Sequence, residues 1–281
     1  MRAIVFNKTC FFFASLIYLF SISDVFSQGN LLIHPKRLNF DAKKDRVKTL
    51  NLTNTGKDSA TYKISFVEIK MTPEGEIKKL DSILPGHRSA SEYLRYFPKT
   101  IRLAPNESQL IKVQLLNAGQ LAEGEYRSHL YLRAVPKVKP MEQQRNASRE
   151  NGMGVRITPV FGYGITTIIR KGEPKLSVGL ENLELESVGE DLRFLAMDMT
   201  RTGNVSSYGE IIVQHISENG KKSRIGLVKG VAVYADADLR RFKVQLKDLK
   251  NTDLTSGQLE VSYYSMGQPG RELYAQSTLE L

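Results

Sequence analysis

The sequence has little of what enzymes and cross-linked proteins need: one cysteine, no tryptophan and four histidines among 281 residues. A single cysteine cannot form an internal disulfide, and zinc modules need paired Cys and His ligands. No two histidines have metal-ligand spacing, and neither a nucleophile elbow nor a P-loop occurs. We therefore expect no enzyme, metal or cofactor. An enzyme built on a pair of Asp or Glu residues is the one enzyme class left open, because such a pair leaves no sequence signature.

The first 27 residues differ from the rest of the chain. Arg2 and Lys8 are basic, residues 10–22 are almost wholly apolar, and Ser27 ends a short small-residue pattern. This pattern predicts a signal peptide that is cleaved after Ser27. The alternative is an uncleaved anchor, but a membrane span needs about 20 apolar residues. Cys10 leaves with the signal, and an exported protein without cysteine favours a bacterial periplasm.

The mature chain alternates apolar and polar residues in short runs, such as 47–52, 62–66 and 111–115. Period-two alternation places one face of a strand on a core and the other in water. No long helical stripe occurs, and only Ser89–Tyr96 fits a helical turn or two. About seven strands at this spacing predict an antiparallel sandwich.

The strand pattern restarts after residues 170–174. Strand candidates in this half are 176–185, 192–199, 211–216, 231–234, 242–246, 259–264 and 273–281. Gly203-Asn204 and Asn219-Gly220 predict hairpin turns. The sequence therefore predicts an all-β chain with a signal peptide (1–27), a first sandwich domain (28–171) and a second (172–281).

The excess of positive charge behind the formal net charge of +10 lies in the first domain only. Residues 28–170 carry 24 Lys and Arg against 13 Asp and Glu, whereas residues 171–281 carry 14 against 16. Such a basic domain first suggests nucleic acid. Export removes that partner, so we expect no nucleic-acid binding.

A polar, basic segment follows Pro136 and predicts a mobile loop. After it, five bulky apolar residues share one parity: Val155, Ile157, Phe161, Tyr163 and Ile165. Pro159 lies among them and cannot donate a ladder hydrogen bond, so this strand should be at an edge or locally irregular. An apolar edge invites pairing with another chain. The alternative, and the more common case, is that this face fills its own sandwich core.

Several stretches resemble, in order, the PapD-like periplasmic chaperones of pilus assembly. They are residues 34–40 (HPKRLNF), 96–105 (YFPKTIRLAP), 109–113 (QLIKV) and 124–136 (GEYRSHLYLRAVP). The last is the most specific, because the family's sixth strand ends in a basic residue and then a proline before a mobile loop. The second half is similar only in length, strand count and position.

The resemblance implies two immunoglobulin-like β-sandwich domains in an L-shaped arrangement with a cleft between them. It also implies donor-strand complementation, in which the chaperone lends its seventh strand to a pilus or fimbrial subunit that lacks one, and then delivers the subunit to an outer-membrane usher. A basic pair in the cleft would hold the C-terminal carboxylate of the subunit. A self-capping homodimer of the free chaperone is left open.

Carried over by position, Arg37 matches the cleft arginine of this family. The donor-strand residues would be Val155, Ile157, Phe161, Tyr163 and Ile165. Thr166 stands where the family has its second anchor, a lysine, and a threonine carries no charge. Arg127, Arg156 and Arg170 are open candidates to replace that lysine. This departure and Pro159 indicate a divergent branch or an unusual substrate.

The second hypothesis is an exported immunoglobulin-like adhesin or carbohydrate-binding module. The absence of Trp counts against a sugar site, although 12 Tyr leave room for one. A chaperone should be found bound to a small β-rich subunit in the periplasm, whereas an adhesin should be alone on the cell surface.

Overall fold

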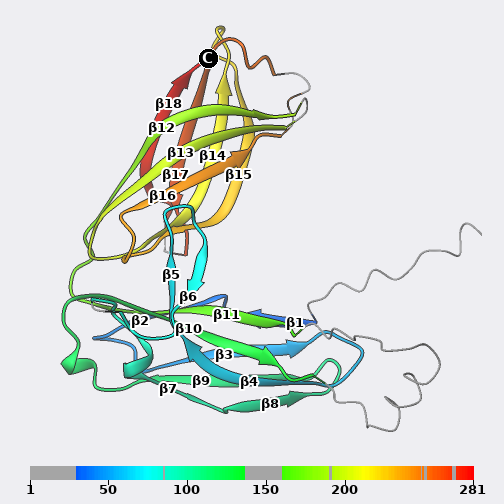
Figure 1. The fold of residues 1–281 in the computed structure, drawn as a ribbon, viewed down its shortest axis with the longest axis vertical. Coiled ribbons are helices and arrows are strands. Elements are labelled where there is room, and N and C mark those ends of the chain that lie inside the picture. Colours follow the sequence, from blue (N-terminus) through cyan, green and yellow to red (C-terminus); the bar gives the residue numbers. More distant parts are fainter. Residues whose placement is uncertain are drawn as a thin grey trace, which may run out of the picture.

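The computed structural model describes residues 30–84, 86–136, 160–189, 192–247, 249, 252–267 and 270–281. These residues form two β-sandwich domains with almost no helix, so the all-β prediction is confirmed (Figure 1). The predicted signal peptide and most of the predicted loop after Pro136 lie outside the described residues. No helix among the described residues is long and apolar enough to cross a membrane.

The first domain pairs a four-stranded sheet with a five-stranded sheet. The first sheet has the order β1 (Leu31–His34), β3 (Val47–Asn54), β9 (Ser108–Leu115) and β7 (Leu94–Phe97). The second has the order β2 (Arg37–Asp41), β11 (Gly162–Lys171), β10 (Gly124–Ala134), β4 (Ala60–Val67) and β8 (Thr100–Leu103). This is the immunoglobulin arrangement, with the first strand divided between the two sheets.

Alternation along the strands builds the core of the first domain. Leu50 and Leu52 of β3 are fully buried, while Asn51 between them is exposed. Leu130 and Leu132 of β10 reach the same core from the facing sheet. The helical turn expected within Ser89–Tyr96 is a single short 3-10 turn, η1 (Ser91–Tyr93), because β7 begins directly after it. A second 3-10 turn, η2, spans Ala118–Gln120.

The second domain is a smaller sandwich with its own core. One sheet has the order β12 (Leu176–Val188), β13 (Leu192–Gly203) and β16 (Leu239–Gln245). The other has the order β15 (Lys222–Val233), β14 (Ser207–Ile216), β17 (Gln258–Ser265) and β18 (Leu273–Glu280). Figure 1 shows this domain standing at a steep angle to the sheets of the first.

The two predicted hairpin turns of the second domain have opposite outcomes. Asn219-Gly220 joins the paired strands β14 and β15, and Gly220 has the positive φ of +80° that such a turn requires. The Gly203-Asn204 prediction was wrong, because β13 and β14 belong to different sheets. This turn therefore carries the chain from one sheet of the sandwich to the other.

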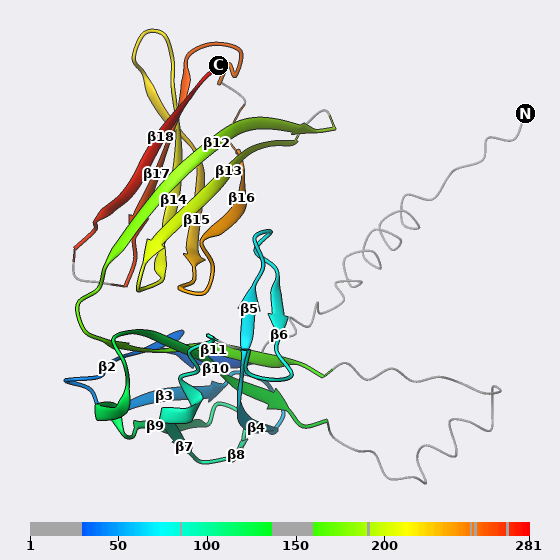
Figure 2. The same cartoon turned by 60° about the vertical axis from the view of Figure 1, so that its left-hand side comes forward.

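A short hairpin connects the two domains through space. Strands β5 (Ile69–Met71) and β6 (Ile77–Lys79) rise from the end of β4 toward the second domain (Figure 2). At the tip, the backbone nitrogen of Arg241 donates to the Pro73 carbonyl at 2.6 Å, and its guanidinium lies 2.9 Å from the Glu74 carboxylate. At the base, Met71 packs with Tyr234 of the second domain. The hairpin thus braces the two domains against each other.

Strand β11 has one complete and one partial neighbour. It pairs with β10 along its whole length but with β2, in parallel, only over residues 166–170. Within the described residues, no strand pairs with the outer edge of residues 162–165. The sequence predicted an edge or irregular strand, and the described part of β11 is an edge in its first half and interior in its second.

Candidate functional site

The two positions carried over as a carboxylate anchor lie side by side in the fold. Arg37 of β2 is the register partner of Thr166 of β11, and Thr166 is the register partner of His129 of β10. Register partners on neighbouring strands point to the same face of a sheet. The three side chains therefore form a row on the face of this sheet that meets the second domain, where Tyr208 and Tyr234 contact Arg37 and His129. We call this face the cleft floor.

His129 is a buried member of this row. Its Nε2 atom lies 3.2 Å from the Thr166 hydroxyl, and its ring meets the Tyr234 ring edge-on at 6.4 Å. Burial, together with the charges of Arg127 and Arg37, lowers the pKa of His129 to about 3. The imidazole is therefore neutral at physiological pH. If Thr166 donates its hydrogen bond to Nε2, Nδ1 carries the proton.

Three buried nitrogen atoms of this region have no hydrogen-bond partner among the described residues. They are Arg37 Nε, Arg127 Nη1 and His129 Nδ1. Leaving a buried donor unsatisfied costs about 1–3 kcal/mol, more for a charged group, so such atoms normally have a partner. Arg37 Nε and Arg127 Nη1 are donors on cations, and His129 Nδ1 is a third donor when Thr166 donates to Nε2. Such donors match the acceptor oxygens of a carboxylate.

Arg37 also contacts the second domain. Its guanidinium lies 3.9 Å from the centre of the Tyr208 ring, within the range of a cation–π contact. This stacking fixes the plane of the guanidinium over the Tyr208 ring and uses none of its N–H groups, and Nε has no hydrogen-bond partner among the described residues. Tyr208 thus orients Arg37 without consuming its hydrogen-bonding capacity.

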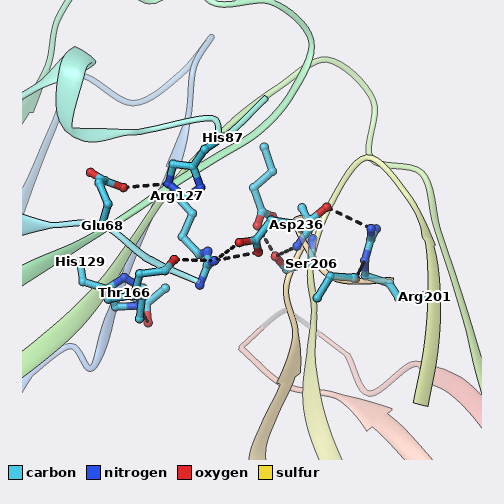
Figure 3. Close-up of polar contacts among 12 residues, drawn as sticks. Glu68, His87, Arg127, His129, Thr166, Arg201, Ser206 and Asp236 are labelled. Atoms are coloured by element: carbon cyan, nitrogen blue, oxygen red, sulfur yellow. Dashed lines mark hydrogen bonds and ion pairs between the residues drawn. The ribbon is translucent and has the colours of Figure 1, made fainter. Parts of the chain in front are cut away.

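Arg127 connects the domains by an ion pair. Its Nη2 atom lies 2.7 and 2.8 Å from the two carboxylate oxygens of Asp236, and its guanidinium lies 3.7 Å from the centre of the Tyr234 ring. Figure 3 shows Arg127 reaching from the first domain to Asp236 of the second. Because Arg127 is only 6% exposed, this pair is a largely buried link between the domains.

A second polar link lies beside the first. The buried Glu125 carboxylate accepts hydrogen bonds from the backbone nitrogen of Ser206 at 3.0 Å and from the Ser206 hydroxyl. Arg170 lies 2.9 Å from the same carboxylate. Arg170 is therefore already paired at the domain interface.

Glu68 organises the base of the hairpin. One carboxylate oxygen accepts from the hydroxyls of Ser89, Ser91 and Ser128 at 2.7–2.9 Å, and the other lies 3.1 Å from His87 Nε2 (Figure 3). The acceptors of this carboxylate are used inside the first domain. We assign this cluster a structural role, since it fixes the end of β4 from which the hairpin rises.

The donor-strand residues expected from the sequence have different surroundings. Val155 and Ile157 lie outside the described residues. Phe161 is 41% exposed just before β11, and Tyr163 is partly buried against the core of the first domain. Ile165 is 5% exposed and belongs to that core. Ile165 therefore fills the core of its own domain, as the alternative to a donor role predicted for this face, whereas Phe161 presents its side chain to solvent.

The three arginines that could replace the missing lysine differ in whether their side chains already have a partner. Arg156 lies outside the described residues, and Arg170 is paired with Glu125. Arg127 lies two residues before His129 on the cleft face of β10 and keeps Nη1 unpartnered. Arg127 and His129 are therefore the described groups that accompany Arg37 and Thr166.

Sequence reasoning missed His129, although a signal for it was present. Along β10 the residues Arg127, His129, Tyr131 and Arg133 alternate with Leu130 and Leu132 of the core. A period-two pattern of this kind assigns the polar set to one face. Within the described residues, no group of three His, Cys, Asp or Glu could hold a metal ion.

No protein-family model matches the chain, and no curated protein matches it. The chain resembles solved chaperone structures over most of its length. A chain of the CsuC–CsuE chaperone–tip adhesion subunit complex of Acinetobacter baumannii has 10% identity and a TM-score of 0.47, covering 87% of this chain and 97% of that one. The YadV chaperone has 12% identity and a TM-score of 0.46, covering 90% and 100%. The CupB2 chaperone of Pseudomonas aeruginosa has 14% identity and a TM-score of 0.42, covering 89% and 100%.

Proposed function

We propose that this chain is a periplasmic chaperone of pilus-type subunits, which it captures by donor-strand complementation and delivers to an outer-membrane usher. One observation carries the proposal. The unpaired outer edge of β11 at residues 162–165 leads directly into the row of Arg37, Thr166 and His129 on the cleft floor. An added strand and its chain end would thus meet two complementary features in succession.

The edge supplies the affinity of strand addition. Residues 162–165 have free backbone groups on the side away from β10, within the described residues. An extended segment pairing there gains main-chain hydrogen bonds irrespective of its sequence. Phe161, which is 41% exposed, would enter the open groove of the subunit beside this added strand.

The row on the cleft floor supplies the anchor. A C-terminal carboxylate of the subunit would accept from Arg37 Nε and His129 Nδ1, with Arg127 Nη1 beside them, all three being buried and unpartnered. Thr166 fixes the His129 ring instead of supplying charge as the family's lysine does. A cation and neutral donors together would hold the carboxylate by charge-assisted hydrogen bonds.

The second domain would serve as the other wall of the anchor. Tyr208 stacks on Arg37, and Asp236 holds Arg127 in place. Both contacts depend on the angle between the domains. Three interdomain links, Arg127–Asp236, Glu125–Ser206 and Arg241–Glu74, support that angle.

Co-expression tests the proposal. The tagged chain would be produced in a periplasm with each small secreted β-rich protein encoded beside its gene, and complexes would be measured by size-exclusion chromatography and native mass spectrometry. We expect a 1:1 complex with at least one of them. A chain that stays free of all of them and is displayed at the cell surface would instead support the adhesin hypothesis. A dimer of the chain in the absence of subunits would be the self-capping form.

A further inference from the structure

A groove runs over the cleft face of the first domain, beside the edge strand. It has a volume of about 890 Å³. Its floor is formed by β4, β10 and β11, and the β5–β6 hairpin forms one wall. His129 is one of its lining residues, so the groove adjoins the row of Arg37, Thr166 and His129.

The lining of the groove combines apolar surface with positive charge. Val67 and Ile69 are partly buried in it, whereas Ile77 and Val160 are 52% and 38% exposed. Three exposed cations complete the lining: Lys63, Lys79 and Arg133. None of the described lining residues is acidic, and none of these cations pairs with a carboxylate within the described part of the chain.

Two glycines of β11 shape the floor. A side chain at Gly162 would collide with Tyr131, whose hydroxyl lies 2.1 Å from the position of a Cβ atom there. A Cβ atom at Gly164 would meet only His129, at 4.0 Å. Gly162 therefore seats the Tyr131 ring, whereas Gly164 leaves the floor of the groove open.

The open floor lies beside the free edge of β11. Alternate side chains of a strand added at residues 162–165 would point to the cleft face. Since Gly164 has no side chain, those of the added strand can cross over β11 into the groove. They would meet both the apolar side chains and the cations that line it.

We infer that this groove reads the cleft-facing side chains of the added subunit strand and selects long apolar and acidic residues there. This rests on the proposed function and adds a determinant of subunit choice to it. Charge complementarity favours carboxylates, because the groove presents cations and no described acid. The apolar floor favours side chains long enough to cover it.

Synthetic peptides with a free C-terminal carboxylate test the inference on the full mature chain. Each peptide would be twelve residues long with valine at every second position. The intervening positions would hold glutamate and leucine in one peptide, lysine and leucine in the second, and serine in the third. Fluorescence anisotropy at two salt concentrations would measure the affinities. We expect the glutamate–leucine peptide to bind at least ten times more tightly than the lysine–leucine peptide.

Two variants localise the effect. Gly164→Leu should fill the groove and weaken the glutamate–leucine peptide at least ten times more than it weakens the serine peptide, whose short side chains do not occupy the groove. Gly119→Leu is the matched control, because a Cβ atom at Gly119 meets nothing within 4 Å and this residue lies outside the groove. Both glycines lack a positive φ, so neither substitution strains the backbone.

Charge reversal provides the second arm. Lys63→Glu, Lys79→Glu and Arg133→Glu together should invert the preference between the acidic and basic peptides. Lys57→Glu, Lys112→Glu and Lys175→Glu make the same change in net charge at exposed positions outside the groove and should not invert it.

The outcomes separate the inference from the proposed function. If the serine peptide binds as tightly as the glutamate–leucine peptide, or both triple variants behave alike, the groove has no selective role while strand addition stands. If no peptide binds, the groove inference is overturned, and the co-expression experiment decides the proposed function independently.

Discussion

The guanidinium of Arg37 lies 3.9 Å from the centre of the Tyr208 ring, so a cation of the first domain rests on an aromatic ring of the second. The contact joins β2 to β14 across the cleft. It orients the arginine while leaving Nε without a hydrogen-bond partner in the described structure. Arg37 is therefore held in one orientation at the place where the two domains meet.

Replacing Arg37 by alanine should abolish subunit capture and leave the protein folded. The side chain is partly exposed and is not part of the core of the first domain, so we expect the thermal midpoint to stay within a few degrees of that of the wild type. Arg37→Lys keeps the charge but not the planar donors and should retain only part of the affinity. Co-purification of the subunit measures the effect. An undiminished yield with Arg37→Ala would show that the cleft arginine is only a surface cation.

Phe161→Asp should block capture of the subunit, because an aspartate cannot enter the apolar groove of the subunit without losing its hydration. Phe97→Asp is the matched control, since Phe97 is also exposed (74%) but lies on β7 of the other sheet. The yield of the 1:1 complex would be compared between the two variants. Equal yields would mean that Phe161 has no donor role.

His129 should make the protein less stable in acid. Its pKa is lowered to about 3 in the folded state from the ordinary 6.5, so below pH 6.5 the unfolded chain binds a proton that the folded chain does not. Stability from this residue is complete above pH 6.5 and falls as the pH drops toward about 3. The groups that face it are Arg127, Arg37, Thr166 and Tyr234.

Urea unfolding at several pH values measures this dependence. His129→Gln should flatten the curve between pH 6.5 and 3, whereas His34→Gln, at an exposed position of β1, should leave it unchanged. Parallel curves for the wild type and His129→Gln would show that the buried histidine does not control the acid response.

Asp236→Ala should destabilise the protein by about 3 kcal/mol, because it leaves the buried Arg127 charge without its partner. Asp238→Ala is the comparison. Asp238 pairs with Arg201, but it is 92% exposed, and Arg201 donates to several backbone carbonyls as well. We expect a change below about 1 kcal/mol for that variant.

The same pair of variants tests the interdomain angle. Small-angle scattering should show a broader distribution of domain orientations for Asp236→Ala than for Asp238→Ala. Indistinguishable stability and scattering for the two variants would contradict a bracing role of the Arg127–Asp236 pair.

Period-two alternation along single strands was enough to predict the all-β fold, since each strand buries one face and exposes the other whatever its neighbours are. The edge character of the first half of β11 was also predicted locally, from a preceding proline that cannot donate a ladder hydrogen bond, whereas the pairing of its second half with β2 was not. The Gly203-Asn204 hairpin failed, because a turn motif does not reveal whether the next strand stays in the same sheet.

The sequence alone determined the alternating strands and the confinement of the positive charge to the first domain, and its resemblance to a known family pointed to the positions Arg37 and Thr166. Only the tertiary structure decided that His129 lies beside Thr166, that Arg127 pairs with Asp236, and that Ile165 is a core residue. These facts depend on strand register and on the angle between domains. Both are set by packing between segments far apart in the chain, which no local pattern records.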